Sequence, residues 1–328
     1  MAKTTPYGSW RSPIDAALAA AHDGHPAFVG FVGDEVWWTE PRPAEGGRRA
    51  LVRRRPDGSE ESVLPALWNV RSRVIEYGGL PWAAAARPGD PRGPLVVFAD
   101  FTDQRLYAHE PDVPEAEPRP LTPLSGVGGG LRFADPRVHA DRGEVWCVLE
   151  EFTGDAPTDV RRVVVAVPLD GSAAEDRSGL RELSDGRHRF VTGPRLSPDG
   201  TRAAWLAWDH PRMPWDGTEL LVADVGADGT FAAAQVLAGG PTESIAQADW
   251  AHDGRLLYSS DRSGWWNLYR AEPDGTASAL CPREEEFGGP LWQLGLNWFA
   301  PLDSGLIAVV HGTGATALAA ISLAWLPR

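Results

Sequence analysis

Six times along the chain, a tight polar turn that ends in glycine is followed directly by a short run of residues typical of β-strands. The turns end at Gly33, Gly93, Gly143, Gly200, Gly254 and Gly305. The runs that follow them span residues 35–40, 95–100, 144–149, 202–207, 255–260 and 306–311. A strand-rich unit that recurs every 50 to 60 residues is typical of β-propeller blades. The repeat therefore predicts an all-β propeller with about six blades.

Each unit continues with a second strand, a turn and an outer strand. Asp-Gly pairs at 57–58, 170–171, 228–229 and 274–275 mark such turns, because both residues tolerate the positive φ of a tight hairpin. We therefore expect about four antiparallel strands per blade. The sixth unit ends after its strand at 318–325, so the last blade is either incomplete or closed by the N-terminal segment. We assign residues 1–27 to an N-terminal lead-in and residues 28–328 to a single propeller domain.

Composition restricts the classes of partner and site. A formal net charge of −14 argues against nucleic acid or an anionic membrane surface as a partner, because phosphate binding depends on clustered Lys and Arg. No apolar run approaches the ~18 residues of a membrane span, and the first residues lack the apolar core of a secretory signal. We therefore expect a cytoplasmic protein. Cys147 and Cys281 are the only cysteines and form no CxxC pair, so we expect no metal site and no cofactor.

The sequence also lacks the common catalytic motifs. It contains no Gly-x-Ser-x-Gly nucleophile elbow, no phosphate-binding loop of the Gly-x-x-x-x-Gly-Lys type, no His-Glu-x-x-His and no EF-hand loop. We therefore expect that the chain is not a serine hydrolase by itself. Whether it is an enzyme of another kind stays open at this stage.

One candidate site precedes the second blade, in the run Glu76-Tyr77-Gly78-Gly79. Paired glycines suit a bulge or a close backbone approach. One interpretation is a structural entry to the strand, with Glu76 capping a turn. The other interpretation is that Glu76 and Tyr77 point into the central tunnel, with Glu76 as a candidate catalytic residue and Tyr77 as a candidate ligand-binding residue.

A second candidate is the loop from Trp208 to Gly217, which is too long for a simple hairpin. Long loops on rigid scaffolds are common places for function. Asp209, His210 and Asp216 are candidates for an acid–base or metal-binding group. A single His with two carboxylates is also compatible with a structural or interface role.

Aromatic residues supply the remaining candidates. Of the 15 tryptophans, most are expected to pack between blades. Those in loops are candidates for lining a ligand pocket, and with Tyr77 they form the predicted ligand-binding set: Trp208, Trp215, Trp265, Trp266 and Trp292.

Several motifs, in order, resemble the N-terminal β-propeller of prolyl oligopeptidase family serine peptidases, in the acylaminoacyl-peptidase and dipeptidyl-aminopeptidase-like branch. The resemblance extends over about residues 6–300 and rests on residues 7–14, 69–79, 101–107, 194–200, 208–217, 260–269 and 286–290, with Trp292. It implies a propeller that caps an α/β-hydrolase domain, filters substrates by size and helps to hold the peptide N-terminus. The sequence departs from the family in three ways: the hydrolase domain and the final repeat are missing, and Ile75 stands where relatives usually carry His.

Three hypotheses about function follow. The first is a peptidase-type propeller with a gating or docking role for a peptide, catalytically incomplete by itself, which works with an α/β-hydrolase partner in trans or as a homo-oligomer. The second is a stand-alone propeller that binds or converts a small molecule with acid–base residues at the tunnel mouth. The third is a non-catalytic scaffold or binding protein. The resemblance favours the first.

Overall fold

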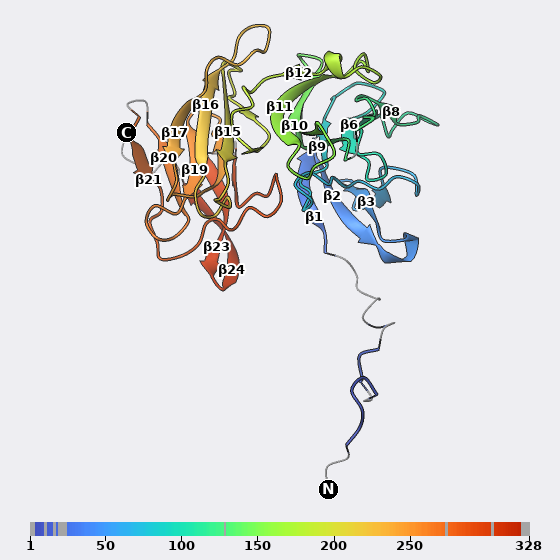
Figure 1. Ribbon diagram of the computed structural model, residues 1–328, viewed down its shortest axis with the longest axis horizontal. Coiled ribbons are helices and arrows are strands. Elements are labelled where there is room, and N and C mark those ends of the chain that lie inside the picture. Colours follow the sequence, from blue (N-terminus) through green and yellow to red (C-terminus); the bar gives the residue numbers. More distant parts are fainter. Residues whose placement is uncertain are drawn as a thin grey trace. The chain divides into compact units, whose positions relative to one another are not determined.

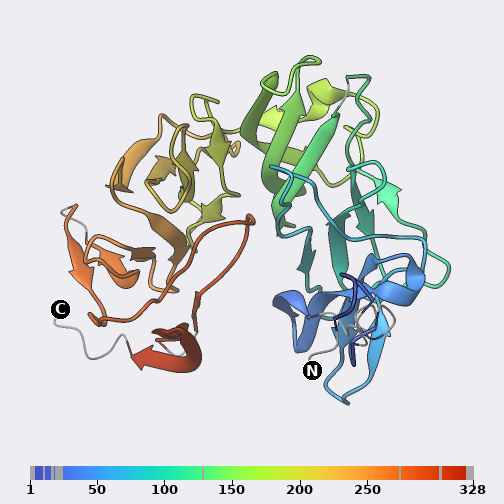
Figure 2. The same ribbon diagram turned by 60° about the horizontal axis from the view of Figure 1, so that its bottom comes forward.

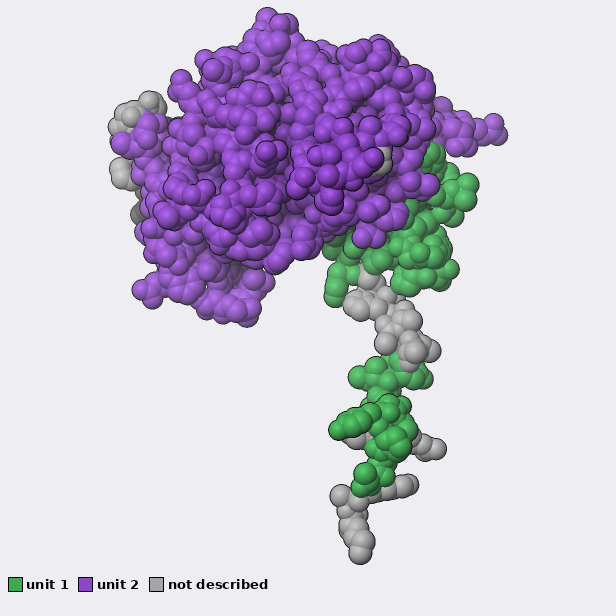
Figure 3. Space-filling model, in the orientation of Figure 1, with its two compact units in different colours: residues 1–70 green, residues 71–328 purple. Residues whose placement is uncertain are grey.

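The computed structural model describes residues 4–9, 12–15, 18, 25–127, 129–272, 275–302 and 305–322. The chain divides into two compact units, unit 1 at residues 1–70 and unit 2 at residues 71–328, which Figure 3 draws in different colours.

Unit 1 carries the first sheet, an antiparallel sheet with its four strands in chain order. These strands are β1 (Ala27–Val32), β2 (Glu35–Arg42), β3 (Arg48–Arg54) and β4 (Glu60–Ser62). A short 3-10 helix, η1 (Pro43–Glu45), joins β2 to β3. The indole of Trp37 on β2 is fully buried in this unit.

Unit 2 carries the other five sheets, which succeed one another along the sequence from teal to red in Figure 1. The second sheet contains β5 (Trp82–Ala85), β6 (Leu95–Ala99), β7 (Leu106–His109) and β8 (Arg119–Pro120). The third sheet contains β9 (Leu131–His139), β10 (Glu144–Phe152), β11 (Val160–Pro168) and β12 (Arg181–Glu182), with the 3-10 helix η2 (Arg177–Gly179) before β12.

The fourth sheet has an inner strand that is split into two short pieces, both paired with the next strand. Its strands are β13 (Phe190–Val191), β14 (Arg195–Leu196), β15 (Arg202–Trp208), β16 (Glu219–Asp224) and β17 (Gln235–Gly239). The fifth sheet contains β18 (Ile245–Trp250), β19 (Leu256–Ser260), β20 (Asn267–Ala271) and β21 (Ala277–Ala279). The sixth contains β22 (Phe299–Pro301), β23 (Leu306–Thr313) and β24 (Ala315–Ser322).

The chain thus has the fold class of an all-β six-bladed β-propeller, with mostly four-stranded antiparallel blades and, within the described residues, a last blade of three strands. This confirms the predicted architecture, and the three described strands fit the first of the two alternatives given for the last blade. The six repeated runs all fall on the second strand of a blade: β2, β6, β10, β15, β19 and β23. The six glycines before them all have positive φ, between 63° and 80°. A side chain is strongly disfavoured in that left-handed conformation, which explains why glycine recurs there.

The second strands of four sheets of unit 2, β6, β10, β15 and β19, are buried almost throughout, whereas β23 in the last sheet is only partly buried. In β10, six consecutive residues from Val145 to Glu150 are buried, with no alternation. Trp146, Trp205 and Trp250 belong to one core cluster drawn from the third, fourth and fifth sheets. Contacts between blades therefore contribute to the hydrophobic stabilisation of unit 2.

The strand order places the loops of unit 2 at two distinct ends of its blades. In an antiparallel sheet whose four strands follow chain order, the first and third turns lie at one end. The second turn and the connection to the next blade lie at the other. The glycine turns mark the first end. The longer connections mark the second, which we call the long-loop end, and Figure 2 gives another view of these connections.

Candidate functional site

The sequence candidates from both loops and from the aromatic set all belong to the long-loop end of unit 2. The segment with Glu76 and Tyr77 leads into β5, and the loop from Trp208 to Gly217 joins β15 to β16. Trp265 and Trp266 lie between β19 and β20, and Trp292 lies between β21 and β22. These are all second turns or blade connections, so the topology gathers the candidates at one end of the blades.

The segment before β5 contains an unusual backbone turn. Ile75 and Glu76 both have positive φ, 51° and 63°. This conformation is rare for residues with a side chain, and it is a genuine outlier for a β-branched residue such as Ile75. Two hydrogen bonds hold the turn: Ile75 N donates to Glu150 Oε2 at 2.9 Å, and Glu76 N donates to the Arg73 carbonyl at 2.9 Å. Strain that surrounding contacts maintain in this way is common at functional sites.

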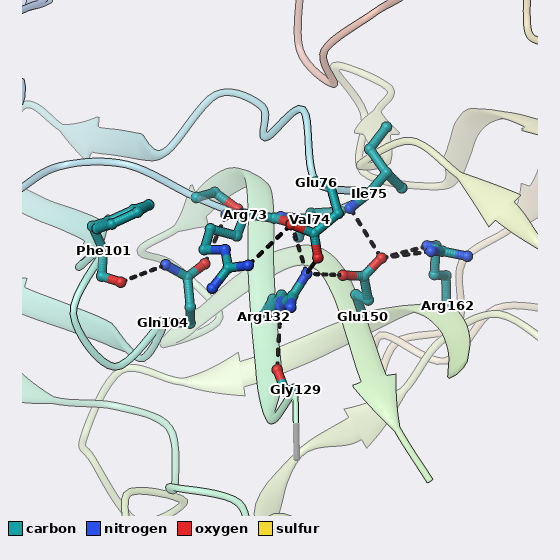
Figure 4. Close-up of polar contacts among 11 residues, drawn as sticks. Arg73, Val74, Ile75, Glu76, Phe101, Gln104, Gly129, Arg132, Glu150 and Arg162 are labelled. Atoms are coloured by element: carbon teal, nitrogen blue, oxygen red, sulfur yellow. Dashed lines mark hydrogen bonds and ion pairs between the residues drawn. The ribbon is translucent and has the colours of Figure 1, made fainter. Parts of the chain in front are cut away.

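Arg132, on β9, connects this turn to the third sheet (Figure 4). Its Nη1 donates to Glu76 Oε1 at 2.6 Å, to Glu150 Oε1 at 3.1 Å and to the Arg73 carbonyl at 3.1 Å. Arg162 pairs with the other carboxylate oxygen of Glu150, Oε2, at 2.6 Å. Glu150 has only 1% of its side chain exposed, so both guanidiniums are needed to offset the cost of burying its charge.

The carboxylate of Glu76 is the solvent-accessible end of this network. Its side chain is 62% exposed, and its Oε2 accepts a 3.0 Å hydrogen bond from Arg73, which is itself exposed. Partial burial raises the pKa of Glu76, but the hydrogen bonds and charges of Arg132 and Arg73 outweigh that effect and lower the pKa below its usual range. Glu76 is therefore a carboxylate with a fixed position and a stable negative charge at neutral pH.

Three of the predicted ligand-binding aromatic residues form one cluster beside this turn. The rings of Tyr77 and Trp292 lie with centroids 5.3 Å apart, and those of Trp292 and Trp215 lie 4.4 Å apart. Tyr77 is 56% exposed and Trp292 is 44% exposed. We call these three residues the aromatic cluster. Exposed aromatic groups gathered in this way are typical of binding sites.

Backbone contacts fix the position of Trp292 against Tyr77. Gly79 and Leu294 form a parallel bridge, and Gln293 Nε2 donates to the Tyr77 carbonyl at 2.8 Å. A Cβ atom at position 79 would lie 2.8 Å from the Leu294 Cβ, so glycine is required for this close approach. The close backbone approach predicted for the paired glycines is confirmed.

The three polar candidates in the long loop between β15 and β16 each contact other residues and, in the described chain, form no hydrogen bond or ion pair with one another. Asp209 faces His188, with 2.8 Å between Oδ2 and Nδ1, and its Oδ1 accepts a hydrogen bond from Arg189 N at 2.6 Å. Asp216 Oδ2 accepts from Met213 N within the loop itself. These contacts do not join Asp209, His210 and Asp216 into one acid–base group.

His210 and Trp208 pack around Phe190. The Trp208 and Phe190 rings are nearly parallel with centroids 5.3 Å apart, and His210 meets Phe190 edge-on at 5.0 Å. The guanidinium of Arg162 lies over the ring of Phe190, 4.5 Å from its centroid. Trp208 is therefore largely a packing residue within the fourth sheet, and it also lines a pocket at this end of the sheet.

Trp265 and Trp266 are half-buried in the turn between β19 and β20. Trp266 is held by two hydrogen bonds: its backbone N donates to Glu286 Oε2 at 2.8 Å, and its Nε1 donates to Ser244 Oγ at 3.3 Å. In the described residues, neither ring makes a contact with the aromatic cluster.

Sequence reasoning missed four residues that organise this end: Arg132, Glu150, Arg162 and His188. They lie on strands or strand entries that carry no motif, and their roles depend on contacts with neighbouring blades. One signal was available for His188. The pairing of Phe190 with Trp208 across β13 and β15 brings the residues just before Phe190 close to those just after Trp208.

Across the described part of the chain, no group of three or more His, Cys, Asp or Glu side chains is arranged to hold a metal ion. In that same part, none of the helices has the length and apolar character needed to cross a bilayer.

Comparisons with known proteins agree with this architecture. Residues 102–285 match the Gmad1 family, which is described as the lipoprotein LpqB β-propeller domain. A search of curated proteins gave no match. A solved puromycin hydrolase is 66% identical over 97% of this chain, with a TM-score of 0.92, and the match covers 48% of that protein. A puromycin-hydrolysing peptidase from Mycobacterium tuberculosis is 43% identical over 98% of this chain, with a TM-score of 0.87 and 48% of that protein covered.

More distant structures share the fold alone. Prolyl oligopeptidase B from Galerina marginata is 10% identical over 94% of this chain, with a TM-score of 0.60 and 44% of that protein covered. The chain spans about half the length of the solved relatives it matches. The chain belongs to the Gmad1 β-propeller family, and it is homologous to the N-terminal propeller of acylaminoacyl-peptidase-like puromycin hydrolases.

Proposed function

We propose that this propeller is the substrate-recognition part of a puromycin-hydrolase-type peptidase, with a gating or docking role. The observation that carries the proposal is the aromatic cluster Tyr77–Trp292–Trp215, which is exposed at the long-loop end directly beside the fixed carboxylate of Glu76. A group of aromatic rings next to a negative charge is complementary to a ligand that carries an aromatic group and a protonated amine. Puromycin, which the relatives hydrolyse, is an aromatic aminoacyl compound with a free amine.

The carboxylate of Glu76 can accept hydrogen bonds from such an amine. Its Oε1 is engaged by Arg132, which is nearly buried, whereas its Oε2 is engaged by Arg73, which is exposed. An ion pair between two exposed side chains contributes little, about 0–1 kcal/mol, so an incoming ammonium group displaces Arg73 at low cost. Arg132 would then keep the carboxylate in position.

The proposal includes no catalysis by these 328 residues alone. They contain no Gly-x-Ser-x-Gly elbow, so the nucleophile would come from an α/β-hydrolase domain or partner. The propeller would contribute recognition of a peptide or aminoacyl ligand.

Isothermal titration of the purified chain with puromycin tests the proposal. Trp292→Ala should weaken binding about tenfold, because an aromatic contact is worth about 1–1.5 kcal/mol beyond buried area. Trp265→Ala is the matched control, since Trp265 lies at the same end but outside the cluster, and it should leave the affinity unchanged. Absence of binding to the wild-type chain, or equal losses in both variants, would overturn the proposal.

A further inference from the structure

A pocket of about 230 Å³ opens at the long-loop end of the fourth sheet. It is formed by the ends of β15, β16 and β17, by the segment before β13 and by the loop from Trp208 to Gly217, and none of the three residues of the aromatic cluster lines it. Its lining residues with chemical functions are His188, Trp208, Asp209, Arg212, Thr218 and Glu219. A volume of this size holds roughly seven or eight water molecules at about 30 Å³ each, which is the size of one small organic molecule.

Most polar groups of the pocket are already engaged with one another. Asp209 uses one oxygen for His188 Nδ1 and the other for Arg189 N. Arg187 Nε donates to His188 Nε2 at 3.1 Å, so both ring nitrogens of His188 have a polar neighbour. The Thr218 hydroxyl donates to the Pro214 carbonyl.

Glu219 is different, because its carboxylate keeps its accepting capacity. Among the residues that the structure describes, its one ion-pair contact is the 3.7 Å approach of His188 Nε2, which is too long for a hydrogen bond. Glu219 is only partly exposed and sits at the first position of β16, where the strand fixes its backbone. It therefore presents a negative charge to the pocket.

Arg212 presents the opposite charge. Its Nε donates to the Pro241 carbonyl at 3.1 Å, and its backbone N donates to the Asp209 carbonyl at 3.1 Å, so both ends of the residue are anchored. Within the described ranges, its guanidinium makes no ion pair. The two terminal nitrogens of the guanidinium are therefore available to a planar anion such as a carboxylate.

The remaining walls are compact and partly apolar. The ring of Trp208 and the methyl of Ala207 contribute apolar surface. The backbones at Gly217 and Gly240 approach so closely that a Cβ at position 217 would lie 2.6 Å from the Gly240 carbonyl oxygen. The backbone at the base of the pocket is therefore rigid. It fixes the positions from which the charged side chains of Glu219 and Arg212 extend.

We propose that this pocket binds a free α-amino acid. The ammonium group of the ligand pairs with Glu219, its carboxylate pairs with Arg212, and its side chain lies against Trp208. A zwitterion matches one unengaged carboxylate and one unengaged guanidinium in a pocket of this size, whereas a simple anion or cation would leave one of them unpaired. The proposal uses no residue of the aromatic cluster, although Trp215 belongs to the same loop, and it does not rest on the puromycin proposal.

The test compares three ligands by isothermal titration with the purified chain: leucine, leucine amide and N-acetyl-leucine. A ligand this small should bind with a Kd on the order of millimolar. Glu219→Gln should weaken leucine and leucine amide about five- to tenfold, and Arg212→Met should weaken leucine and N-acetyl-leucine by a similar factor. Each variant should leave unchanged the ligand that lacks the group it contacts.

Several controls keep the test decisive. Glu175→Gln and Arg92→Met change exposed charges outside the pocket and should have no effect. Trp292→Ala should also have no effect, which separates this site from the aromatic cluster. Arg212→Lys retains the charge and should recover part of the affinity, provided that melting temperatures match. The proposal is overturned if wild-type chain binds none of the three ligands at 10-fold the expected Kd, about 10 mM, or if Glu219→Gln and Arg212→Met affect all three equally.

Discussion

Tyr77 and Trp292 lie in ring contact, 5.3 Å between centroids, although one belongs to the start of unit 2 and the other to its C-terminal third. The contact depends on the parallel bridge between Gly79 and Leu294, which joins the two segments by their backbones. Propeller topology makes such a contact possible, because every blade connection returns to the same end. The long-loop end is therefore assembled from segments that are distant in sequence, and its binding properties follow from that assembly.

The first prediction concerns the buried ion network. Replacing Arg132 by Met should reduce the free energy of unfolding by about 2–3 kcal/mol, because it leaves one oxygen of the buried Glu150 without its partner. Arg73→Met removes the exposed pair with Glu76 and should cost less than about 1 kcal/mol. Urea-induced unfolding at pH 7.5, followed by tryptophan fluorescence, measures both. Equal losses for the two variants would contradict the assignment of Glu150 as the critical buried charge.

The second prediction concerns stability at mildly acidic pH. Burial lowers the pKa of His139 to about 4, and its Nε2 has no hydrogen-bond partner among the described residues. The unfolded chain binds a proton on this histidine near pH 6.5, so the stability contribution of neutral His139 is complete above that pH and is lost as the pH falls towards 4. Between pH 7.5 and pH 5 the loss is about 2 kcal/mol.

The variant His139→Gln should lack this component. Its free energy of unfolding should therefore fall less between pH 7.5 and pH 5 than that of the wild-type chain, in paired denaturant titrations. His188→Gln provides a control histidine at the opposite end of the blades. Parallel pH dependences for the wild-type chain and for His139→Gln would show that His139 is accessible to protons in the folded state.

The third prediction concerns the two free thiols. Cys147 lies in the middle of β10, is fully buried, and burial raises the pKa of its thiol. Cys281 is only partly buried. A thiol reagent such as N-ethylmaleimide at pH 7.5 should therefore modify Cys281 in the native chain and both cysteines after unfolding. Mass spectrometry of the two samples checks this, and rapid native modification of Cys147 would show that the third blade opens readily.

The fourth prediction concerns catalysis. The purified chain should neither hydrolyse puromycin nor react covalently with a fluorophosphonate probe, because it contains no serine in a nucleophile elbow. A full-length puromycin hydrolase treated in parallel serves as the positive control. Stoichiometric labelling of a single serine in this chain would refute the proposed dependence on an added hydrolase domain.

The blades were predictable from the sequence because a local rule governs them. A glycine in left-handed conformation must precede each second strand, and this requirement appears at Gly143 or Gly200 as clearly in the sequence as in the structure. The close approach at Gly79 was predictable for a similar reason. In each case the backbone conformation of a single residue limits the choice of amino acid.

The partners within the candidate site were not predictable in the same way. Glu76 was identified, but Arg132 and Glu150 lie on a different blade and carry no local signature. His210 was a reasonable candidate partner for Asp209, yet the imidazole that faces Asp209 is that of His188. Side-chain contacts between blades depend on strand register and blade packing, which a short motif does not encode.

The central claim is that the aromatic cluster binds the aminoacyl ligand, and the indole N–H resonances of the tryptophans test it most directly. Each indole gives one signal in a ¹H–¹⁵N correlation spectrum, and Trp→Ala variants assign those of Trp215, Trp265 and Trp292. On titration with puromycin, we predict that the Trp292 and Trp215 signals shift with a common dissociation constant while the Trp265 signal stays in place. Shifts confined to other tryptophans, or no shift at saturating ligand, would contradict the account.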